Sequence, residues 1–101
     1  MRCRSYEKFF GTIANKTRIK IIELLFDSSY SVSEICDKLD EEQSKISHNL
    51  KILLDCNFIE QEAVGKTRIY SINSKTIKPL FELVKEHVRD NCNGGCGCSK
   101  K

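Results

Sequence analysis

The spacing of apolar residues changes twice along the chain. Through residues 5–15 and 17–26 they recur at steps of three and four, which is the period of an amphipathic helix. From Asn57 onward the period becomes two, as in a β-strand, and over residues 74–88 it returns to helical spacing. The pattern therefore predicts two helices at the start, a β-hairpin in the second half and a final helix.

Capping signals mark two more helices between these segments. Ser31 and Glu34 have the spacing of a capping box, in which the serine oxygen accepts a hydrogen bond from the glutamate amide, so a third helix is predicted to begin there. Asp40 lies three residues before Gln43 and is predicted to cap a fourth helix. Asn15 is predicted either to end the first helix or to cap the second.

The fourth helix has two faces of opposite character. One side is apolar and is expected to face inward, with Ile46, Leu50, Leu53 and Leu54. The opposite side presents residues whose side chains can all hydrogen-bond: Gln43, Ser44, Lys45, Ser47, His48 and Lys51. A tight turn joins this helix to the third one, so the pair is predicted to form a helix-turn-helix.

The hairpin is predicted to turn at Gly65, because glycine adopts the backbone conformations that tight turns need. Lys66 and Arg68 put positive charge at the tip of this hairpin. Pro79 is compatible with the first turn of the last helix. The expected fold is mainly α with a small β-hairpin, in the order α-α-α-α-β-β-α, which is a winged helix-turn-helix.

Length and composition limit how the chain is organised. With 101 residues, of which 40% are hydrophobic, it can close one core but not two. We expect one domain over residues 1–91 and a cysteine-rich tail over residues 92–101. The chain shows neither an export signal nor an apolar run that could span a membrane, so we expect a cytoplasmic protein without a membrane partner. The net charge of +3 is compatible with nucleic acid but does not indicate it alone.

The six cysteines suggest thiol chemistry instead of a disulfide framework, because cytoplasmic thiols are kept reduced. Cys92, Cys96 and Cys98 crowd into the last ten residues, where metal binding and redox sensing are the leading explanations. Three clustered thiols exceed what a simple disulfide switch requires, which favours a metal site. Cys36 is expected to be a small hydrophobic residue of the core.

Three motifs together resemble the ArsR/SmtB family of winged helix-turn-helix regulators, and the resemblance spans nearly the whole chain. Residues 15–25 are similar to the family's second-helix signature, residues 43–53 to its recognition helix and residues 65–70 to its wing. The resemblance implies a homodimer joined by the first and last helices. Such a dimer presents two recognition helices to a pseudo-palindromic operator in double-stranded DNA.

The recognition helix and the wing supply the residues that we expect to contact DNA. Ser44, Ser47 and His48 are short or planar groups that can meet base edges in the major groove, and Gln43 belongs to the same face. The DNA phosphates are expected to contact four cations: Lys45, Lys51, Lys66 and Arg68. A solvated helix face would explain each residue separately, but it explains their joint placement poorly.

Two sensing sites of the family are not matched in this chain. The arsenic-type site on the third helix needs Cys-Val-Cys, whereas this chain has Ser31-Val32-Ser33. The zinc-type site on the last helix needs pairs of histidines and carboxylates across the dimer. The matching positions hold Lys75, Glu86, Arg89 and a single histidine, His87, which is expected to be a surface residue.

The remaining thiols are the candidate ligands for a soft ion. The cluster of Cys92, Cys96 and Cys98 resembles that of arsenic-responsive members with a thiol triad after the last helix. Cys56 resembles a ligand of cadmium- and lead-responsive members, although Ile52 occupies the position of the second cysteine of that pair.

Cys3, near the start of the chain, is a further candidate ligand. The candidate ions are As(III), Sb(III), Cd(II), Pb(II) and Zn(II). We therefore expect a repressor that leaves its operator when thiolates capture such an ion. A redox-sensing repressor of the same fold is one alternative, and a small cysteine-rich metal-binding or interaction protein without DNA binding is another. An enzyme is not expected, since no pair of nucleophile and base is evident.

Overall fold

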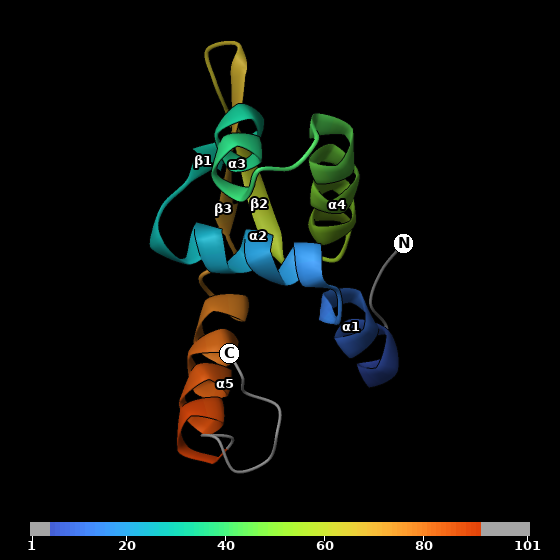
Figure 1. Cartoon of the computed structure of the whole chain (residues 1–101), viewed down its shortest axis with the longest axis vertical. Helices are drawn as coiled ribbons and strands as arrows, with labels where there is room; N and C mark the ends of the chain where they lie inside the picture. Colours follow the sequence, from blue (N-terminus) through green and yellow to red (C-terminus); the bar gives the residue numbers. More distant parts are fainter. Residues whose placement is uncertain (1–4, 92–101) are drawn as a thin grey trace.

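The computed structural model describes residues 5–91, which form helices and three strands in the predicted order with one addition (Figure 1). The elements are α1 (Tyr6–Ile13), α2 (Lys16–Asp27), β1 (Tyr30–Ser31), α3 (Val32–Leu39), α4 (Gln43–Asp55), β2 (Ile59–Val64), β3 (Thr67–Ile72) and α5 (Ile77–Asn91). The winged helix-turn-helix is confirmed. The predictions for Cys3, Cys92, Cys96 and Cys98 fall outside the described residues.

The addition is β1, which turns the hairpin into a three-stranded antiparallel sheet with the order β1-β3-β2. Tyr30 pairs with Tyr70, which fixes the start of α3 beside the wing. A strand of two residues has no measurable period, so the apolar pattern did not reveal it. Gly65 adopts a φ of 65° in the turn between β2 and β3, as the hairpin prediction required.

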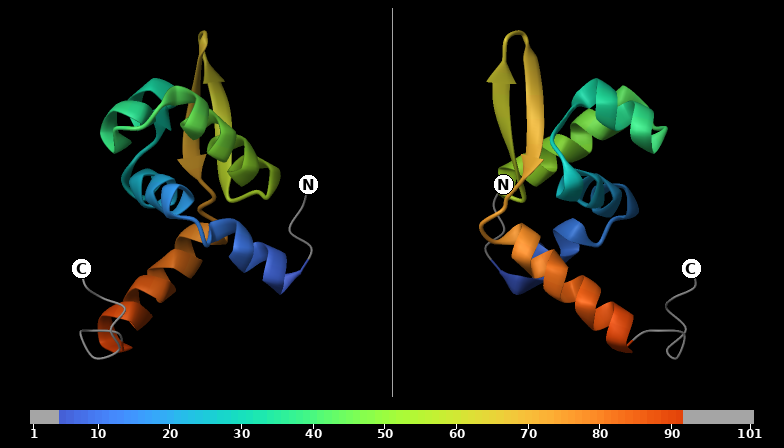
Figure 2. Two further views of the ribbon diagram at one scale, coloured as in Figure 1. Left: turned by 45° about the vertical axis from the view of Figure 1, so that its right-hand side comes forward. Right: turned by 90° about the vertical axis from the view of Figure 1, so that its left-hand side faces the viewer.

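The hydrophobic core lies where α2, α3 and α4 meet the base of the wing. Its buried side chains are Ile21, Ile22, Leu25, Ile35, Ile46, Leu50, Leu53, Phe58, Ile59, Tyr70, Ile72 and Ile77. Helix α1 contributes none of them, and α5 contributes only Ile77. Both helices lie on the side of α2 that is opposite to the tip of the wing, as all three views show (Figures 1 and 2).

The capping predictions had mixed outcomes. The box at Ser31 is confirmed, since the Ser31 Oγ accepts from the Glu34 amide at 3.3 Å and Glu34 Oε1 accepts from the Ser31 amide at 2.9 Å. Asn15 caps α2 by accepting from the Arg18 amide at 3.0 Å. Helix α5 begins later than its apolar pattern indicated, because Asn73 Oδ1 accepts from the Lys75 and Thr76 amides and holds that segment in a turn.

The prediction that Asp40 caps α4 was wrong. Asp40 is the residue that ends α3, with a left-handed backbone at φ 56° and ψ 52° and its amide bonded to the Cys36 carbonyl. Aspartate tolerates this conformation better than most residues, because its short polar side chain can hydrogen-bond locally. Helix α4 instead begins after Glu42, whose side chain makes no capping hydrogen bond.

Replacing Ser31 with alanine should test the capping box. The variant leaves the Glu34 amide without its acceptor, so the free energy of unfolding is expected to fall by about 1 kcal/mol. Chemical denaturation at matched protein concentration measures the loss. Ser33→Ala, at an exposed position in the same turn, is the control, and an equal loss in both variants would contradict a specific role for the cap.

Candidate nucleic-acid interface

Helix α4 is oriented by the side chains that it buries. Ile46, Leu50 and Leu53 are almost completely excluded from solvent, and they pack against α2, α3 and the start of β2. Leu54 is half-buried at the edge of the same contact. A helix anchored along one side in this way has a fixed outward face, because residues three and four apart share a side.

All eight residues that the sequence predicted to contact DNA are exposed. Six of them lie on the outward face of α4, and the other two lie on the hairpin. Lys45 forms an exposed ion pair with Glu41 at 3.1 Å, and Ser44 Oγ donates to Glu42 Oε1 at 3.4 Å. Surface contacts of this kind contribute little free energy, so they can open when a stronger partner approaches.

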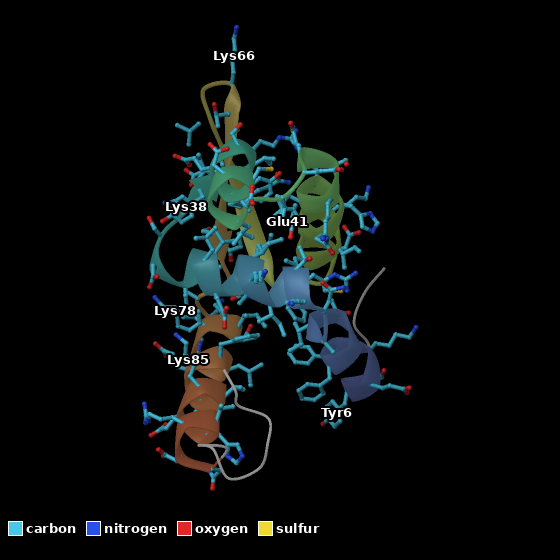
Figure 3. All side chains as sticks on the ribbon, viewed as in Figure 1. Tyr6, Lys38, Glu41, Lys66, Lys78 and Lys85 are labelled. Carbon is cyan, nitrogen blue, oxygen red and sulfur yellow. The ribbon has the colours of Figure 1, made fainter. Side chains whose placement is uncertain are left out.

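The wing places its cations at the same end of the molecule as the first turn of α4 (Figures 1 and 3). Lys66 occupies the turn of the hairpin and extends away from the body of the protein (Figure 3). Arg68 follows on β3, opposite Ala63 on β2. A polar helix face beside a basic hairpin has the shape and charge to meet a DNA groove and its phosphates.

Two residues of this region were missed by sequence analysis. Asn49 lies on α4 between the outward Ser47 and His48 and the buried Leu50, and it is only 6% exposed. Arg18, at the start of α2, donates from Nε to Asn49 Oδ1 at 2.9 Å and from Nη1 to the Thr12 carbonyl at 2.9 Å. An asparagine at a core-facing position was the only available signal, and it did not name its partner.

The described cysteines lie at the edge of the core. Cys36 is half-buried, as expected of a small core residue, and burial followed by the nearby Asp37 carboxylate raises the pKa of its thiol. Cys56 ends α4 and is half-buried, with its Sγ 4.0 Å from Thr12 Oγ1. Within residues 5–91 no three histidine, cysteine or acidic side chains come together as a metal site, so Cys56 has no such cluster there.

The positions of the zinc-type site are also without a metal-binding arrangement in the described part of α5 and the turn before it. His87 is exposed, as predicted, and its ring Nδ1 lies 3.3 Å from the side-chain nitrogen of Asn91. Lys75, Glu86 and Arg89 are exposed as well.

Comparison with known sequences identifies the family. The family described as bacterial regulatory protein, arsR family, matches residues 15–61. The arsenical resistance operon repressor of Bacillus subtilis (strain 168) is 35% identical over 79 residues, which cover 77% of this chain and 75% of that protein. The chain belongs to the ArsR family. Its fold and its relatives are those of transcription regulators, a class without enzymatic activity, as the sequence indicated.

Solved structures agree with this assignment. The crystal structure of Rv0081 from M. tuberculosis superposes with a TM-score of 0.81 and 28% identity, covering 87% of this ArsR-family chain and 89% of that one. The winged helix-turn-helix domain of Mb0332 from Mycobacterium bovis, described as homodimeric, has a TM-score of 0.79 at 22% identity, covering 89% and 83% of the two chains, and supports the fold. Among residues 5–91, no helix has the length and apolar character needed to cross a membrane.

The environment of Cys36 predicts slow alkylation. At about pH 8, iodoacetamide should modify Cys36 more slowly in the native protein than in urea, because burial limits access and keeps the thiol protonated. The native rate should rise with pH as the thiolate fraction grows. Mass spectrometry of the peptide that contains Cys36 measures both rates, and equal rates in the two states would disagree with the structure.

Proposed function

We propose that this ArsR-family chain is a transcriptional repressor that binds operator DNA as a homodimer and releases it when cysteine thiolates bind a soft metal or metalloid ion. The observation that carries the proposal is the exposed polar face of α4 beside a basic wing. DNA recognition needs both features, because side chains in the groove read the bases while cations on the phosphates supply affinity.

The proposed roles divide the interface by chemistry. Ser44, Ser47 and His48 contact base edges, and Gln43 lies at the start of the same helix face. Four cations bind phosphates: Lys45, Lys51, Lys66 and Arg68. The Lys45 ammonium exchanges its exposed contact with Glu41 for a phosphate when DNA binds. Because the phosphate contacts release counterions, the affinity for any duplex depends on salt, whereas the base contacts distinguish the operator.

Apolar side chains at the other end of the molecule support the homodimer. Tyr6 and Phe10 on α1 are 87% and 58% exposed, and Leu83 on α5 is 64% exposed. An apolar groove of about 360 Å³ runs between α2 and α5. Exposed apolar faces on two adjacent helices are typical of a protein interface, and a second copy of the chain brings matching faces.

The tail thiols support ion sensing by their chemistry and their position in the sequence. Three thiolates suit soft ions such as As(III), Sb(III), Cd(II) or Pb(II), and Zn(II) also accepts them. Cys92 directly follows the last residue of α5, so the proposed site adjoins a helix of the proposed dimer interface. An ion that binds more tightly to one arrangement of the dimer would shift the equilibrium away from the arrangement that fits the operator.

Gel-shift titrations with paired variants test the DNA interface. The parent protein should bind duplex DNA, with affinity falling steeply as salt rises; four phosphate contacts in each protomer of a dimer imply a log–log slope of about −7. Ser47→Ala with His48→Ala should reduce preference for the operator and preserve most non-specific binding. Lys66→Ala with Arg68→Ala should weaken both kinds of binding and make the slope shallower.

The two pairs of substitutions serve as controls for each other, since each removes two exposed side chains from one element. Equal losses of operator and non-specific binding in both variants would show that base and phosphate contacts are assigned wrongly. A parent protein that binds no duplex at low salt, or whose affinity does not respond to salt, would overturn the DNA-binding proposal itself.

Removing the tail tests ion sensing. A chain that ends at Asn91 keeps every described element, so it should bind operator as tightly as the parent. It should no longer release the operator when arsenite or cadmium is added, because an effector must distinguish the two states in order to shift them. In the parent, ion affinity should rise with pH through the thiol range, since thiolate ligation releases protons.

Full-length Cys56→Ser is the matched control and should still respond to the ions. A shortened chain that dissociates from DNA on adding either ion would place the sensor elsewhere, with Cys56 and Cys3 as the next candidates. If the intact protein ignores both ions but releases DNA with diamide and recovers with a thiol reductant, the redox alternative is correct.

A further inference from the structure

We infer that Arg18 is a positioning residue for DNA recognition, which holds α4 in a fixed relation to α1 through Asn49 and the Thr12 carbonyl. The inference rests on the proposed function, because it assigns a role to Arg18 in operator binding. Arg18 itself is half-buried at the start of α2 and lies behind the exposed face of α4.

The guanidinium bridges two elements that are far apart in the sequence. Its Nε donates to Asn49 Oδ1 on α4 at 2.9 Å, and its Nη1 donates to the backbone carbonyl of Thr12 in the last turn of α1 at 2.9 Å. The planar fork of arginine can reach both acceptors at once, whereas a lysine ammonium on a flexible stem lacks this geometry. Arg18 therefore links α1 to α4 directly.

Asn49 depends on this link because it is buried. Its Oδ1 accepts from Arg18, and its Nδ2 donates to the Lys45 carbonyl one turn earlier at 2.9 Å. Within residues 5–91, no carboxylate lies within ion-pair distance of Arg18, so neutral oxygens are what hold the cation. Removing the guanidinium leaves a buried amide oxygen without its donor, which costs more than the net value of one hydrogen bond.

A second contact joins the same two helices. Thr12 Oγ1 lies 4.0 Å from the Sγ of Cys56 at the end of α4 and also donates to the Lys8 carbonyl at 2.8 Å. Asn49 and Cys56 are about two helical turns apart, so α1 meets α4 near its middle and at its end. Two points of contact along an axis resist rotation as well as translation.

The location of the link determines which part of DNA binding it serves. Asn49 directly follows Ser47 and His48, the proposed base-contacting residues. Base contacts need side chains placed to within a fraction of an ångström, whereas attraction to phosphates tolerates looser geometry. Loss of the link should therefore reduce the preference for operator over non-specific DNA while leaving the attraction to phosphates intact.

The experiment compares Arg18→Gln, Arg18→Lys and Asn49→Ala with Lys16→Gln. Lys16 is an exposed cation in the same turn of α2, so its variant removes the same charge without breaking the link. The operator is the duplex that the parent protein selects from a random pool. Each protein is titrated against operator and against an unrelated duplex, across a salt series and below its measured unfolding temperature.

We expect the ratio of operator to non-specific affinity to fall at least about tenfold in the three link variants, as the loss of a charged hydrogen bond implies. The ratio should stay at the parental value in Lys16→Gln, and the salt slope should be that of the parent in the link variants. Arg18→Gln combined with Asn49→Ala should be no worse than the more affected single variant, because both remove one interaction.

Three results would overturn the inference. The link variants could keep the parental ratio, which would show that the packing of Phe9 on Phe58, with ring centroids 5.0 Å apart, is sufficient to place α1. The losses of Arg18→Gln and Asn49→Ala could add in the combined variant, which would mean that the residues act separately. A salt slope that is shallower by about 1 in Arg18→Gln would make Arg18 a direct phosphate contact.

A measurement without DNA separates this inference from the proposed function. Amide hydrogen exchange over α4 should be faster in Arg18→Gln and Asn49→Ala than in Lys16→Gln and the parent, since the link restrains the helix in the free protein. Unchanged exchange would count against the link even if the variants bind DNA weakly. If exchange rises as expected but the parent binds no duplex, the proposed function fails while the structural link remains.

Discussion

Burial of one side of α4 is the constraint on which the rest of this structure depends. Ile46, Leu50 and Leu53 are enclosed by α2, α3 and the base of the wing, and burial of each such side chain contributes roughly 1.5–3 kcal/mol. Turning the helix would expose these residues and place Ser47 or His48 in the core, where their polar groups lack partners. The same packing that stabilises the domain therefore chooses which side chains can reach a ligand.

The remaining surface divides by chemistry between two ends of the molecule. The start of α4 and the wing tip form a polar and basic end, while α1 and α5 carry exposed apolar side chains at the other (Figure 3). Helix α5 buries only Ile77, and Lys85 covers part of α2 by lying 4.4 Å from the Phe26 ring centroid. Recognition and assembly thus use separate surfaces, and α2, with Arg18 at its start, lies between them.

The order of the long elements and the outward face of α4 could be predicted from the sequence, because apolar period and capping are local signals. Ser31 and Asn15 could be placed correctly for the same reason. Strand β1 and the bond between Arg18 and Asn49 could not, since pairing across 31 residues leaves no local pattern. Asp40 was misplaced because one residue type suits both the start of a helix and a left-handed end. The tail thiols lie outside the described residues, so their assignment is still a prediction.

The wing loses contact with the core as it leaves the base. Ile59 is buried, but every following residue of β2 up to Val64 is exposed, and the neighbouring turn contains only Gly65 and Lys66 before β3 begins. Substitutions in this outer half change almost no buried surface, provided that the turn keeps a residue tolerant of positive φ. Descendants of this gene can therefore explore new wing sequences, and with them new operators, without first acquiring compensating changes in the core.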